Sequence, residues 1–114
     1  MEIKTQHYSI YYDKLTETAV FNGSLRLSGI EEYDPIVQLL NDLAEQQPST
    51  ITLNLRQLEF LNSSGINVLS KFVIKVRQKG NIRMVVLGSH EIPWQGKSLK
   101  NLQRLMPSLD LVLE

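Results

Sequence analysis

The sequence has no cysteine, only two histidines and no long run of apolar residues. Without cysteine there is no disulfide or thiolate chemistry, and neither His7 nor His90 has a carboxylate or a second histidine at metal-site spacing. The longest uncharged apolar run, residues 84–88, is far shorter than the roughly 20 residues that span a bilayer, and the N-terminus has no apolar signal-peptide core. We therefore expect a cytoplasmic protein without a membrane span, a metal site or a cofactor.

An excess of charge of either sign is also missing. The chain has 12 Lys or Arg and 12 Asp or Glu, so it lacks the concentrated basic charge that binding to a phosphate backbone requires. We therefore expect no nucleic-acid partner. The charges are nevertheless unevenly distributed, because residues 1–55 have a net charge of −5 and residues 56–114 a net charge of +5. We interpret this as two solvated helix faces of opposite sign; the alternative is a bipolar surface that orients a partner.

The length and the pattern of apolar residues predict a single α/β domain over residues 1–114. Residues 7–13 and 18–27 read as antiparallel strands, with Asn22-Gly23 as a bulge in the second strand. An N-cap at Asp34 and Pro35 at the first helical position then predict a helix that ends before Pro48. This helix should pack Ile36, Leu40 and Leu43 on the sheet.

The rest of the chain alternates strands with helices. The predicted elements are a strand at 50–55, a helix that starts near Ser64 and closes at Gly80, a strand at 82–88 that is covered on both faces, a helix that stops before Pro107, and a strand at 109–114. The order ββαβαβαβ requires right-handed crossovers. We therefore expect a mixed, mostly parallel sheet of about five strands with the helices packed on it.

The stretch "LEFLNSSGINVL", residues 58–69, places Asn62, Ser63, Ser64 and Gly65 between two apolar runs. A hydrolase is not supported, because the glycine-serine-glycine elbow is absent and the one carboxylate near His90, Glu91, points elsewhere if the segment is extended. Glycine-rich phosphate loops are absent as well, so we expect no enzyme. Helix capping by Asn62 or Ser63, worth about 1 kcal/mol, explains one polar side chain. Capping does not explain the second serine hydroxyl, which lies at the edge of the sheet where the loops of parallel strands usually carry functional groups.

The segment "ITLNLRQLEFLNSSGINVLSKFVIKV" resembles the signature of the STAS domain family, in which a strand and a short loop lead to "DSSG" at the start of an amphipathic helix. "FNGSL" is similar to the glycine-acidic-leucine that ends a strand in this family. The resemblance implies a non-enzymatic regulator of the anti-sigma factor antagonist type, acting in signal transduction and transcription. In such proteins the second serine is phosphorylated by a partner anti-sigma factor, a serine kinase of the GHKL ATPase type, and the modified form releases that partner. Carried over, the phosphoacceptor is Ser64, with Ser63 as the alternative.

The sequence departs from the family pattern at two places. Asn62 stands where the family usually has Asp, and the chain ends at Glu114 without the C-terminal helix that typically covers the sheet. A bare sheet face or edge would leave room for a partner or for a second copy in a homodimer.

The predicted partner-binding residues extend beyond the serine loop. Trp94 lies in the loop 89–96, which we expect beside "NSSG", and Lys71 lies on the basic surface of the second helix. A packing role for Trp94 is the alternative. The full predicted set is Asn62, Ser63, Ser64, Gly65, Lys71 and Trp94.

Two other functions stay open at this point. In one, the protein is a constitutive scaffold or dimerisation module, and Asn62 marks the loss of phosphorylation. In the other, the start of the helix at Ser64 binds a small anionic ligand or nucleotide, because helix N-termini attract anions.

Overall fold

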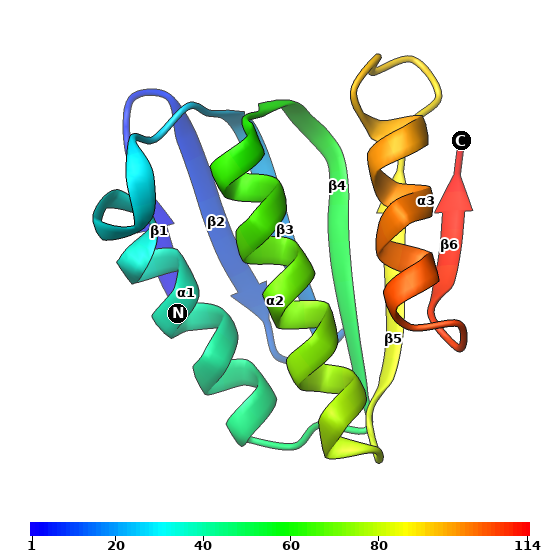
Figure 1. Cartoon of the computed structure of the whole chain (residues 1–114). Coiled ribbons are helices and arrows are strands. Elements are labelled where there is room, and N and C mark those ends of the chain that lie inside the picture. The colour runs from blue at the N-terminus through cyan, green and yellow to red at the C-terminus, as the bar shows by residue number, and fades with distance from the viewer.

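Six strands form one sheet, in the order in which they follow one another along the chain (Figure 1). The computed structural model describes residues 1–114. The strands are β1 (Glu2–Lys4), β2 (Tyr8–Asp13), β3 (Thr18–Leu25), β4 (Thr50–Leu61), β5 (Arg83–Gly88) and β6 (Asp110–Leu113), and the helices are α1 (Gly29–Glu45), α2 (Ser63–Lys79) and α3 (Gln95–Leu105). The pairs β1/β2 and β2/β3 are antiparallel, and the three pairs from β3 to β6 are parallel. The predicted class and mostly parallel sheet are confirmed, with β1 as a strand that the sequence reading missed.

All three helices lie on the same face of the sheet (Figure 1). The parallel strands are added in one direction, from β3 to β6, and right-handed crossovers that all step in one direction leave their helices on one side. The prediction that residues 82–88 form a strand covered on both faces is therefore wrong. Met84 and Val86 are buried beneath the helices, whereas Val85 and Leu87 on the other face are only half-buried. No helix of the structure is long and apolar enough to cross a membrane.

The first helix begins earlier than predicted. It starts at Gly29, with Ser28 at the N-cap and Pro35 inside the helix, so Asp34 is not its cap. The carboxylate of Glu32 accepts a hydrogen bond of 2.8 Å from the backbone N–H of Ser28 and thereby satisfies one of the unpaired backbone donors at the helix start. The earlier start also buries Tyr33, which is 1% exposed. The burial of this large ring offsets the loss of the helical hydrogen bond that Pro35 cannot donate.

Strand β4 is twice as long as predicted, because bulges change its period. Its pairing with β3 shifts register between Val20 and Asn22 and again between Gly23 and Ser24. The predicted bulge at Asn22-Gly23 is wrong, because both residues pair in regular register with β2 and the extra residues of the two shifts belong to β4. The buried positions of β4 consequently change from every second residue, at Leu53 and Leu55, to every third, at Leu58 and Leu61. Alternation alone could not reveal this continuation of the strand.

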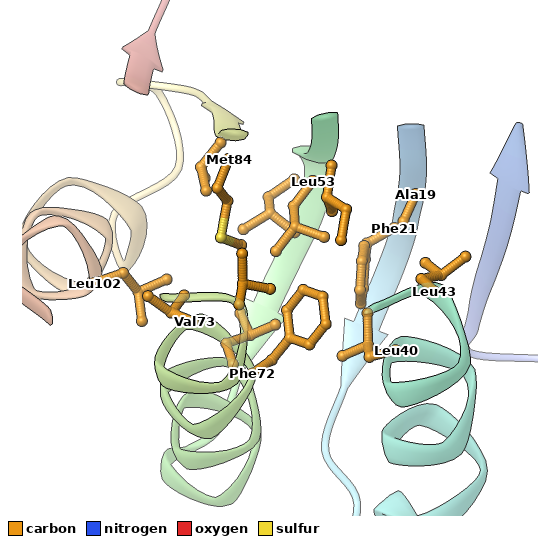
Figure 2. Close-up of a cluster of buried hydrophobic side chains, with 14 of the residues drawn as sticks. Ala19, Phe21, Leu40, Leu43, Leu53, Phe72, Val73, Met84 and Leu102 are labelled. Atoms are coloured by element: carbon orange, nitrogen blue, oxygen red, sulfur yellow. The ribbon is translucent and has the colours of Figure 1, made fainter. Parts of the chain in front are cut away.

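The hydrophobic core fills the space between the sheet and the helices (Figure 2). The predicted contacts of α1 are confirmed, because Ile36, Leu40 and Leu43 are at most 1% exposed. The side of α2 that faces the core carries Leu69, Phe72, Val73 and Val76. The third helix and the last strand also form as predicted.

Candidate functional site

The serine loop lies at the carboxyl edge of the parallel strands. Strands β3 and β4 end side by side at Leu25 and Leu61, and α2 starts two residues after β4 (Figure 1). Loops at this edge of an α/β sheet are the usual location of functional groups. The arrangement therefore places residues 62–65 where the sequence reading expected them.

Asn62 joins three parts of the chain. Its Oδ1 accepts hydrogen bonds from the backbone N–H of Gly65 at 3.0 Å and from the phenol of Tyr33 at 2.6 Å. Its Nδ2 donates to the carbonyl of Leu27 at 2.8 Å. Burial raises the pKa of Tyr33 above its usual 10.0, so the phenol stays protonated and can donate. Asn62 is thus the N-cap of α2 and also fixes the loop between β3 and α1.

This network explains why the residue is an amide. A carboxylate could accept from Gly65 and Tyr33, but it has no proton to donate to the carbonyl of Leu27. With Asp at position 62, two acceptor oxygens would face each other at hydrogen-bond distance. Asn therefore fits this loop better than the family's usual Asp.

Gly65 is required by close packing. A Cβ added at this position would collide with the Cδ1 of Leu61 and lie 2.7 Å from the hydroxyl oxygen of Tyr33. Gly65 lets α2 begin directly above the end of β4, which brings Asn62 within reach of Tyr33.

The two serines face different surroundings. Ser63 is the first residue of α2 and is exposed, whereas Ser64 is half-buried. The cap of α2 is made by the side chain of Asn62, so capping occupies neither serine hydroxyl. Ser64 also lines a groove between α1 and α2, and Lys71 lines the same groove two helical turns further on. Ser64 and Lys71, two of the predicted site residues, thus line the same groove.

Trp94 contacts a different part of β4. Its indole N–H donates to the carbonyl of Leu58 at 3.1 Å, and the side chain is half-buried. The neighbouring Gln95, which is fully buried, donates to the carbonyls of Leu55 and Leu58 and accepts from the backbone N–H of Ser89. The packing role of Trp94 is therefore observed, and its contact with a partner stays a prediction.

Gln95 has a structural role that the sequence reading missed. The bulged part of β4 contains the two carbonyls to which it donates, and such irregular stretches leave backbone groups in need of partners. No local signal identifies this role, because the two carbonyls to which Gln95 donates are 37 and 40 residues away.

The model of the STAS domain family matches residues 27–95, which include α1, β4, α2 and the serine loop. No curated protein sequence matches the chain.

Three solved structures share the fold. A chain in the crystal structure of the diguanylate cyclase SiaD in complex with its activator SiaC from Pseudomonas aeruginosa is similar with a TM-score of 0.72, 15% identity and coverage of 99% of this chain and 97% of that one. SiaC of Pseudomonas aeruginosa gives a TM-score of 0.70 at 13% identity, covering 98% and 93%. An anti-sigma factor antagonist from Mycobacterium paratuberculosis gives a TM-score of 0.66 at 16% identity, covering 95% and 90%.

Proposed function

Because this chain belongs to the STAS domain family, we propose that it is a non-enzymatic regulatory module that binds a protein partner through residues 62–65. In this proposal a partner serine kinase of the anti-sigma factor type, with a GHKL ATPase domain, phosphorylates Ser64, and the modified form releases the partner. The observation that carries the proposal is the position of Ser64. Its hydroxyl lies at the N-terminus of α2, is not needed for capping, and lines an open groove.

The site can accept a phosphate without unfolding. A phosphoserine adds about −1.5 to −2 charges, and at a helix N-terminus it meets unpaired N–H groups and the positive end of the helix dipole. The first turn of α2 contains no acidic residue that would repel it. A partner surface shaped for a neutral loop would instead have to desolvate a dianion. Phosphorylation should therefore change affinity far more than stability.

The structural neighbours support a role in protein regulation. One is named as an anti-sigma factor antagonist, and another is named as the activator of a diguanylate cyclase with which it forms a complex. Asn62 in place of Asp would favour the alternative, a constitutive scaffold that is not phosphorylated, only if the amide had no structural role. Its hydrogen bond to Leu27 supplies such a role, so we prefer the switched module.

The test combines identification of the partner with measurement of its affinity. Wild-type protein is used to capture partners from the native cell, and mass spectrometry reports their identity and the phosphorylation of Ser63 and Ser64. Calorimetry with the purified partner then compares Ser64→Asp with Ser63→Asp, a matched charge on the exposed neighbour.

We expect Ser64→Asp to weaken binding at least tenfold, about 1.4 kcal/mol, while the melting temperature hardly changes. The effect of Ser63→Asp, and that of Ser63→Ala, should be smaller. Equal affinity of the wild type and Ser64→Asp, with no phosphate on Ser64, would contradict the switch and favour a constitutive scaffold.

A further inference from the structure

A groove of about 380 Å³ runs between α1 and α2, and contacts at two levels join these helices. At one level Tyr33 of α1 donates to Asn62 at the start of α2, a contact that we call the upper bridge. At the other, Lys75 and Lys79 of α2 both contact the carboxylate of Glu45 at 3.2 Å, which we call the lower bridge. From Tyr33 to Glu45 the helix rises about 18 Å. The distance between the two bridges therefore matches the length of about three turns of another helix.

The floor of the groove is apolar and partly open. Val37 and Leu40 of α1 face Val68 and Phe72 of α2 across it. Ile30, which also lines the groove, keeps 72% of its surface exposed. An isoleucine this exposed beside an apolar floor is typical of a surface that another protein covers.

The two sides of the groove have opposite charge. Helix α1 contains Glu31, Glu32, Asp34, Asp42 and Glu45 and no Lys or Arg, whereas α2 contains Lys71, Lys75, Arg77 and Lys79 and no Asp or Glu. Asp34 and Lys71 line the groove from opposite sides, and both are exposed. Lys71 makes no ion pair within the chain, unlike Lys75. A molecule bound in the groove would therefore meet negative charge on the α1 side and positive charge on the α2 side.

We propose that this groove binds an amphipathic helix of the partner protein, with acidic residues of that helix beside α2 and basic residues beside α1. Apolar side chains at helical spacing would fill the floor, as in other helix-in-groove complexes. The opposite charges of the two sides then set the orientation of the bound helix, because the reversed helix would place like charges together. This inference rests on the proposed function in one respect, namely that the partner is a protein.

The position of Ser64 links the groove to the proposed switch. Ser64 and Asp34 both line the groove, so a phosphate on Ser64 would add negative charge inside the docking surface. The acidic side of a bound helix would be repelled directly, without a conformational change in this domain. The inference therefore gives the release step a physical cause.

The test pairs each groove variant with a matched variant elsewhere. Lys71→Glu reverses a charge in the groove, and Lys100→Glu makes the same change on the exposed side of α3. Ile30→Ser removes an exposed apolar residue from the groove, and Leu15→Ser does so in the turn between β2 and β3, where Leu15 is 96% exposed. We expect Lys71→Glu and Ile30→Ser each to weaken binding of the captured partner at least tenfold, with less than a twofold change for the two controls.

A photo-crosslinking residue placed at position 30 or 15 of the full chain identifies the occupant. We expect a crosslink only from position 30, to a partner segment with apolar residues at helical spacing and flanks of opposite charge. If both groove variants bind like the wild type while Ser64→Asp still releases the partner, the groove inference is overturned and the proposed function stands. A small molecule that copurifies with the wild type and is lost from Lys71→Glu in native mass spectrometry would overturn the helix as the occupant. Failure to capture any protein would overturn both proposals.

Discussion

The upper and lower bridges join the same two helices by different physical means. The upper bridge is neutral, and its phenol belongs to a side chain that is 1% exposed. The lower bridge is ionic, and the side chain of Glu45 is 59% exposed. Water and salt screen exposed ion pairs, whereas a buried polar group that loses its partner is strongly destabilising. The upper bridge should therefore contribute more to stability than the lower bridge.

Removal of the Asn62 side chain should have the largest effect. Asn62→Ala deletes the cap of α2 and leaves the buried phenol of Tyr33 without its acceptor. We expect a loss of about 3 kcal/mol in the free energy of unfolding, measured by urea denaturation. Asn67→Ala, at an exposed position of the same helix, is the control. A loss below about 1 kcal/mol would show that the upper bridge contributes no more than an ordinary cap.

A methyl group at position 65 should have the next largest effect. Gly65→Ala forces Leu61 or the phenol of Tyr33 to move, and overpacking of this kind costs about 1 to 3 kcal/mol. The control is Gly96→Ala in α3, where a Cβ would meet no atom within 4 Å. It should stabilise the protein by about 0.5 kcal/mol. If both variants change stability in the same direction, the close contact at Gly65 is not tight.

Replacement of the amide by a carboxylate should have a smaller effect. Asn62→Asp keeps both acceptor contacts and loses only the donation to Leu27. We expect a loss of about 1 kcal/mol. Amide exchange should increase in the loop between β3 and α1. Equal stability and unchanged exchange in this loop would mean that the hydrogen bond to Leu27 does not explain the amide at this position.

Loss of the lower bridge should have the smallest effect. Hydrogen bonds from Lys79 and Lys75 lower the pKa of Glu45 below 4.5. A carboxyl group whose pKa is lower in the folded state than in the unfolded state stabilises the fold at pH values above its unfolded pKa. This contribution is lost as the pH falls through the folded pKa. Glu45→Gln should therefore show a barely measurable loss at pH 7 that vanishes under acidic conditions and weakens with salt. A loss as large as that of Asn62→Ala would make the two bridges equivalent and contradict the comparison.

Features of the fold that depend on nearby residues could be predicted from the sequence, whereas features that depend on distant residues could not. Most of the strands, the apolar faces of α1 and α2, and the end of α2 at Gly80 follow from periodicity and capping, which act within a few residues. The start of α1 was mispredicted because Asp34-Pro35 is a strong local signal, and burial of Tyr33 outweighs it. The second half of β4 was missed because a bulge changes the spacing of its buried residues.

Residues close together in the chain are enough to specify the α/β class, the family resemblance and the position of Ser64 at the start of an amphipathic helix. The reason why residue 62 is an amide emerges from the folded chain, because its partners Tyr33 and Leu27 lie 29 and 35 residues away. The fold also places an acidic and a basic helix on opposite sides of the groove that Ser64 lines. The crossovers through α1 and α2 step in the same direction along the sheet and therefore place both helices on one face. The acidic residues of α1 and the basic residues of α2 thus come to lie on the two sides of one groove.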